Sequence, residues 1–165
     1  MKRILIILLT AFSLAPLNAQ IDSLKLEINR LISKKNATVG ISIIANNFRD
    51  TININEDLHY PMQSVFKFPI ALAVLSEVDN KTLNLKQKIN ISAKDLLPDT
   101  WSPSRNKYPN GTSMPLSEII WYTVAESDNN GCDILLQLLG GITAIDEFLS
   151  KQQLTDISIK ASDKD

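Results

Sequence analysis

The sequence predicts an α/β (α+β) protein in which a short β-hairpin precedes a mainly helical region. Residues 39–45 are β-branched and apolar, and residues 51–54 alternate in polarity, so we expect two strands joined by a turn at 46–47, the first of them buried. The apolar run over 65–78 predicts a buried helix. Beyond residue 92 the pattern is helical except for one loop rich in proline.

Further helices are predicted from capping residues and apolar periodicity. Asp22 is a good N-cap for a helix ending near Lys35, and Gly140-Gly141 is a good stop signal. No strand is expected after the first hairpin, although two strands alone form only a marginal sheet. The predicted helices cover 22–35, 65–78, 117–125, 128–139 and 143–150, and the loop covers 98–115.

Composition excludes several classes of function. The chain has 165 residues, enough for one domain, and a formal net charge of −1, which gives no broad basic surface for nucleic acid. Its one cysteine excludes an internal disulfide, and one cysteine with one histidine are too few for a His- or Cys-rich zinc site. Of these two, we expect His59 to be a loop residue and Cys132 to be a small buried apolar residue. We therefore expect no metal.

The first nineteen residues have the layout of a secretory signal peptide. Lys2 and Arg3 precede an apolar run, Pro16 interrupts it, and Ala19 is a small residue suited to cleavage. The apolar run is shorter than the roughly 20 residues that a membrane-spanning helix needs. We therefore predict a signal peptide over 1–19, a periplasmic or secreted location, and no membrane attachment after cleavage.

Ser64 and Lys67 form a Ser-x-x-Lys motif at the start of the predicted buried helix. Residues three apart lie on one helix face, so the lysine amine can sit beside the serine hydroxyl and activate it as a nucleophile. The motif alone is weak evidence, since a chain of this composition contains about one by chance. A second match, 104–107, falls in the proline-rich loop, and we interpret it as solvated loop.

Ser127, Asp128 and Asn129 are a rarer signal. A Ser-Asp-Asn triplet is expected by chance in only about one such chain in ten. It stands where one predicted helix ends and the next begins, so helix capping explains one or two of its residues. Capping does not explain its occurrence after a helical Ser-x-x-Lys motif.

Together these motifs resemble those of class A serine β-lactamases. Residues 60–69 are similar to that family's nucleophile segment, and 127–129 match its second motif. Segments 95–98, 100–103 and 109–112 are most similar to the extended-spectrum VEB and PER branch. The resemblance extends over the whole chain, and it implies a helical domain set against an antiparallel sheet, of which the first hairpin is present here.

The resemblance implies a role for each matching residue. Ser64 would attack the β-lactam carbonyl, Lys67 would be the base in that step or would position one, and Ser127 would pass a proton to the departing nitrogen. Asn129 would bind the substrate side chain, and Asp128 would be structural. Trp101 would line the pocket mouth, and an ordinary packed loop aromatic explains it equally well. No cofactor or metal is implied, and we expect a monomer acting on a small-molecule β-lactam, with no nucleic-acid partner.

The chain departs from the family pattern in two places. No Lys-Thr-Gly or Lys-Ser-Gly motif follows Ser127, so we expect 20–165 to be an incomplete β-lactamase domain, with a helix and hairpin at 20–58 and the active-site region at 59–165. The family's deacylating glutamate is matched in position only by Asp163. Asp163 is either a substitute for that glutamate or a solvated tail residue.

The expected function is therefore hydrolysis of β-lactam antibiotics through an acyl-serine. Two alternatives stay open. A penicillin-binding D,D-peptidase-like protein would share Ser64 and Lys67 but lack an efficient deacylating base, and an inactive truncated remnant would bind nothing.

Overall fold

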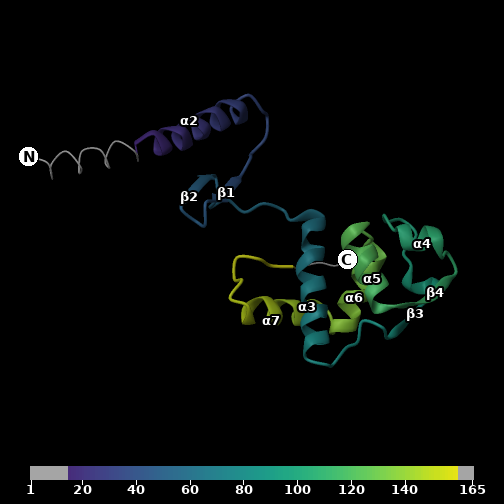
Figure 1. Cartoon of the computed structure of the whole chain (residues 1–165). Helices are drawn as coiled ribbons and strands as arrows, with labels where there is room; N and C mark the ends of the chain where they lie inside the picture. Colours follow the sequence, from purple (N-terminus) through teal and green to yellow (C-terminus); the bar gives the residue numbers. More distant parts are fainter. Residues whose placement is uncertain (1–14, 160–165) are drawn as a thin grey trace, which may run out of the picture. The chain divides into compact units, whose positions relative to one another are not determined.

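The computed structural model describes residues 15–159, which form two compact units divided between Tyr60 and Pro61. Figure 1 traces the order of the elements. The first unit contains α2 (Ala15–Ile32), β1 (Ile41–Ala45) and β2 (Asp50–Ile54). The second contains all the remaining elements, and all the described candidate site residues lie in it.

The N-terminal helix differs from its prediction. Within the described residues helix α2 covers Ala15–Ile32, so Asp22 lies inside the helix rather than capping it, and the helix ends at Ile32 instead of Lys35. Pro16 lies within this helix and does not interrupt it. Residues 1–14 of the predicted signal peptide lie outside the described residues, and its cleavage stays a prediction.

The first hairpin forms as predicted, with β1 and β2 antiparallel and Ile43 opposite Ile52. Its turn places Asn46, Asn47 and Phe48 at positive φ. The expectation that the first strand is buried is wrong within the described chain. Four of the five β1 residues are exposed, among them Ile43, which lies on the same face as its buried partner Ile52.

The second unit is organised around α3 (Lys67–Asp79), which follows the short 3-10 helix η1 (Gln63–Phe66). Helix α3 packs against α5 (Leu116–Ala125), α6 (Asn129–Leu139) and α7 (Ile142–Lys151), as Figure 1 shows. The predicted helices in this region are thus confirmed. The side chains buried between them include Ile70, Val74, Ile119, Leu135, Ile145 and Leu149.

A second strand pair corrects the sequence prediction. Strands β3 (Lys88–Ser92) and β4 (Gly111–Pro115) pair antiparallel, with Ser92 opposite Gly111. Apolar and polar residues alternate in β3, and this pattern is typical of a strand. In contrast, β4 carries little apolar periodicity and owes its conformation to pairing with a distant segment. Gly111 has φ 88°, and a Cβ there would lie 2.3 Å from the Ile91 carbonyl oxygen. Only glycine fits this approach.

The proline-rich loop also contains a short helix, α4 (Pro103–Lys107). Ser102 caps it by accepting a hydrogen bond from the Arg105 amide, and Pro103 takes the favourable first position. Ser104 is buried. The interpretation of 104–107 as solvated loop was therefore wrong, because the cap and the buried serine fasten this segment to the rest of the unit.

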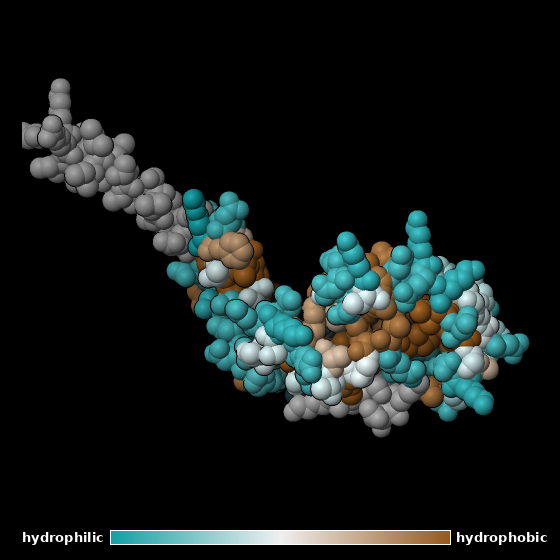
Figure 2. All heavy atoms as spheres, turned by 90° about the horizontal axis from the view of Figure 1, so that it is seen from below, coloured by the Kyte–Doolittle hydropathy of each residue, from teal (hydrophilic) through white to brown (hydrophobic). Residues whose placement is uncertain are grey.

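Apolar side chains also reach the surface of the second unit, as Figure 2 shows. Helix α3 alone exposes Phe68, Leu72 and Leu75 to 37% or more. None of the helices within the described residues combines the length and apolar character needed to cross a bilayer.

Candidate active site

Four predicted residues converge at the amino-terminal end of α3. Ser64 lies in η1, Lys67 begins α3, Ser127 lies between α5 and α6, and Asn129 begins α6. Ser64 is exposed, while Lys67 is only 2% exposed. The arrangement therefore presents a hydroxyl at the surface above a buried amine.

Lys67 connects these groups by hydrogen bonds. Its Nζ lies 3.2 Å from Ser64 Oγ and 3.2 Å from Ser127 Oγ, and it donates to the Ser127 carbonyl oxygen at 2.9 Å. It also donates to Asn129 Oδ1. An ammonium has three N–H donors for these four oxygens. At least one contact must therefore be shared, or be reversed so that a serine hydroxyl donates to a neutral amine.

Asn129 is fixed from both ends of its side chain. Its Oδ1 accepts from Lys67, and its Nδ2 donates to Thr100 Oγ1. Its backbone N–H donates to the Trp101 carbonyl oxygen at 3.0 Å. Thr100 was missed by sequence reasoning, since nothing local in the sequence marks a threonine 29 residues away as its partner.

Asp128 is fully buried and holds the loop before α4 against the start of α6. Its carboxylate accepts from Ser102 Oγ at 2.9 Å, from the Ser104 amide at 2.7 Å and from the Gly131 amide at 2.8 Å. The Gly131 bond caps α6. This geometry supports a structural role for Asp128. Nothing local in the sequence indicates Ser102 or Ser104 as its partners, because they lie 26 and 24 residues away.

Trp101 lies beside this cluster on the same loop. The residue is 62% exposed, and its Nε1 donates to the Glu126 carbonyl oxygen at 2.9 Å. The hydrogen bond fixes the ring in place, while the exposed face leaves it able to contact a ligand.

Two residues of the site have unusual backbone conformations. Ser127 has φ 55° and Gln63, next to Ser64, has φ 48°. A residue other than glycine rarely adopts positive φ, and such strain is concentrated at functional sites. In Ser127 this conformation accompanies the presentation of both its carbonyl oxygen and its hydroxyl to Lys67.

The remaining predicted residues lie elsewhere. Asp163 falls outside the described residues. His59 is exposed, and Cys132 is buried in the apolar core, both as predicted. Among residues 15–159, no group of three or more His, Cys, Asp or Glu side chains is placed to hold a metal ion.

The site combines the elements of nucleophilic acyl transfer. These are a hydroxyl at the start of a helix, a buried amine within reach of it, and a second hydroxyl that contacts the same amine. The chain belongs to the beta-lactamase enzyme family, whose model matches residues 23–164. Over 99% of its length it is 52% identical to Beta-lactamase VEB-1 of Pseudomonas aeruginosa, covering 55% of that protein. It is 32% identical to Extended-spectrum beta-lactamase PER-1 of the same species, covering 95% of this chain and 51% of the relative.

Solved structures agree with this relationship. A beta-lactamase from Chitinophaga pinensis superposes with a TM-score of 0.81 at 43% identity, over 84% of this chain and 52% of that one. The TLA-1 extended-spectrum beta-lactamase gives a TM-score of 0.82 at 44% identity, over 87% and 52%. The predicted fold class and the resemblance to the VEB and PER branch are confirmed. The chain spans about half the length of the curated relatives it matches.

Proposed function

We propose that the protein hydrolyses the amide bond of β-lactams through a covalent acyl-serine on Ser64. The observation that carries this proposal is the position of the buried Lys67 amine, within 3.2 Å of both the Ser64 and Ser127 hydroxyls. The similarity to named β-lactamases supplies the substrate class.

Acylation begins when the Lys67 amine takes the proton of Ser64 Oγ. The alkoxide attacks the lactam carbonyl, and the Ser64 backbone N–H donates to the oxygen that becomes negatively charged. One such donor contributes about 3–4 kcal/mol to barrier lowering in related hydrolases. When the C–N bond breaks, Ser127 gives its proton to the departing nitrogen and takes one from Lys67, which restores the amine.

Deacylation needs a water molecule and a base. We assign the base to Asp163, by its position in the chain after the Ser127 motif. The carboxylate takes a proton from water, the hydroxide attacks the ester, and Ser64 leaves with that proton. An aspartate reaches about 1 Å less far than a glutamate, and such a misplacement can cost about a hundredfold in rate.

The other roles follow the same geometry. Asn129 binds the substrate side-chain amide, Trp101 lines the mouth of the pocket, and Asp128 holds the loop that carries Trp101. We further propose export to the periplasm or medium after cleavage of residues 1–19, and a monomeric enzyme that requires no cofactor.

The decisive experiment uses the full-length protein with a chromogenic cephalosporin and a labelled penicillin. We expect rapid turnover and a transient adduct on Ser64, both lost in Ser64→Ala. Ser104→Ala is the matched control, because it removes the serine of the other Ser-x-x-Lys motif. A stable adduct with little turnover would instead favour a penicillin-binding peptidase, and the absence of an adduct would favour an inactive remnant.

A second variant tests the deacylation step. In Asp163→Asn we expect acylation to proceed while hydrolysis slows, so that the acyl-enzyme accumulates and is visible by intact-protein mass spectrometry. Unchanged turnover in this variant would contradict the assignment of Asp163.

A further inference from the structure

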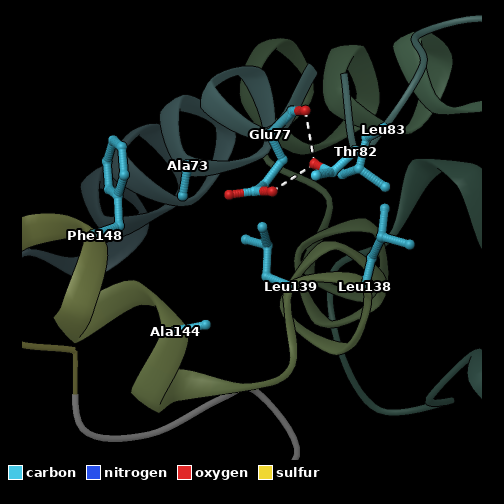
Figure 3. Close-up of a pocket in the computed structure, with 8 residues that line it drawn as sticks. All are labelled: Ala73, Glu77, Thr82, Leu83, Leu138, Leu139, Ala144 and Phe148. Carbon is cyan, nitrogen blue, oxygen red and sulfur yellow. Dashed lines mark hydrogen bonds between the residues drawn. The ribbon is translucent and has the colours of Figure 1, made fainter. Parts of the chain in front are cut away.

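A cavity lies at the carboxyl end of α3, between that helix, α6 and α7 (Figure 3). Its volume is about 200 Å³. Most of the lining is apolar, and the polar exceptions are Glu77 and Thr82. The principal apolar side chains are those of Ala73, Leu138, Leu139 and Phe148.

Glu77 is held in a defined orientation at this cavity. The Thr82 hydroxyl donates to one of its carboxylate oxygens and, at 2.8 Å, to its carbonyl oxygen. The Thr82 backbone N–H donates to the same carbonyl at 3.0 Å. Figure 3 shows the second carboxylate oxygen pointing away from Thr82, toward the side where Ala73 and Phe148 lie. A preformed acceptor therefore faces the apolar walls.

The charge of this acceptor is not balanced locally. Among the described residues, Glu77 is the only charged one in the cavity lining, and it has no salt-bridge partner there. A carboxylate beside apolar surface gains most from a cation that can also donate a hydrogen bond. Charge complementarity thus favours an ammonium group at Glu77.

The volume limits the rest of the ligand. An apolar cavity of about 150 Å³ accommodates a benzene molecule, so about 200 Å³ accommodates one ring or a branched aliphatic group with a short aminomethyl arm. We propose that this cavity binds a small primary amine bearing one compact apolar group. The ammonium binds Glu77, and the apolar group packs on Leu138, Leu139 and Phe148.

This site is separate from the proposed active site. Glu77 follows Lys67 by ten residues on the same helix, which corresponds to about 15 Å of helical rise. Binding at the cavity requires none of the groups that contact Lys67. The inference therefore stands or falls independently of the proposed hydrolysis.

The test is an NMR titration of the full-length protein with benzylamine, observing the methyl groups of Leu138 and Leu139. We expect saturable shifts with a millimolar Kd, the range open to so small a ligand. Benzyl alcohol, which lacks the charge, should bind about tenfold more weakly, and benzoate should not bind. No saturable shift up to about 20 mM benzylamine would overturn the proposal and indicate that the cavity is filled in the whole protein.

Two variants locate the binding. Glu77→Gln keeps the shape and an acceptor for Thr82, and should weaken benzylamine about tenfold while leaving benzyl alcohol unchanged. Ala144→Leu fills the cavity and should abolish the shifts from both ligands. Equal binding of benzylamine to the wild type and to both variants would place the amine elsewhere and overturn the assignment.

Discussion

The two strand pairs within residues 15–159 have the same size and differ in how they are covered. Each consists of two antiparallel five-residue strands. In β3–β4 the apolar residues Ile91 and Met114 are buried, at 7% and 4% exposure. In β1–β2, Ile52 of β2 is buried, whereas Ile44 of β1, on the opposite face, is 57% exposed. Two paired strands can therefore form without being buried. Whether their apolar faces are buried depends on the segments that pack against them.

The difference begins in the sequence of each strand. Strand β3 reads Lys-Ile-Asn-Ile-Ser and alternates, as a strand with one covered face should. Strand β1 reads Ile-Ser-Ile-Ile-Ala and carries apolar residues on both faces. The second unit also contains buried polar contacts between distant segments, above all those of Asp128. Four substitutions, each measured by denaturant unfolding of the full-length protein, test this contrast.

The largest effect is expected for Asp128→Ala. Removing this carboxylate leaves three buried donors, those of Ser102, Ser104 and Gly131, without their acceptor. We expect a loss of about 3–5 kcal/mol. The matched control is Asp57→Ala in the first unit, where the side chain is exposed and the change should stay within about 0.5 kcal/mol. Equal losses in the two variants would refute the contrast.

Met114→Ala should cost about 2–4 kcal/mol, because it opens a cavity in the core beneath β4. Met114→Leu conserves the volume approximately and should cost less than about 1.5 kcal/mol. If Met114→Ala had no effect on unfolding, the second strand pair would not be anchored by its buried face.

Gly111→Ala should cost about 2 kcal/mol, since it adds a clash with the Ile91 carbonyl to the strain of a positive φ. Gly140 provides the comparison, because it also has positive φ but has open space where a Cβ would lie. Gly140→Ala should therefore cost only about 1 kcal/mol. If Gly140→Ala cost as much as Gly111→Ala or more, the close approach of the Ile91 carbonyl would add nothing to the cost of the positive φ at Gly111.

The smallest effect is expected for Ile44→Thr. The side chain is 57% exposed and both residues favour strands, so the change should stay within about 0.5 kcal/mol. A loss above about 1.5 kcal/mol would show that Ile44 is covered in the whole protein, and would make the two strand pairs alike.

Much of the site was predictable because its key residues are close in sequence. Ser64 and Lys67 are three residues apart, so any helix through them brings their side chains together. Ser127, Asp128 and Asn129 are consecutive, and their triplet is rare enough to be noticed. What linked the two groups at the sequence level was resemblance to a family, because the Lys67 contacts with Ser127 and Asn129 span 60 or more residues.

The sequence by itself determined the first hairpin and the helices of the second unit, and it determined that a serine and a lysine share one helix face. These features follow from periodicity and capping, which act between residues only a few positions apart. Only the tertiary structure decided that β4 is a strand, that Ser104 is buried, that Thr100 orients Asn129 and that Glu77 faces a cavity. Each of these depends on a partner from a distant segment, and such a partner is chosen by packing of the whole unit rather than by local preference.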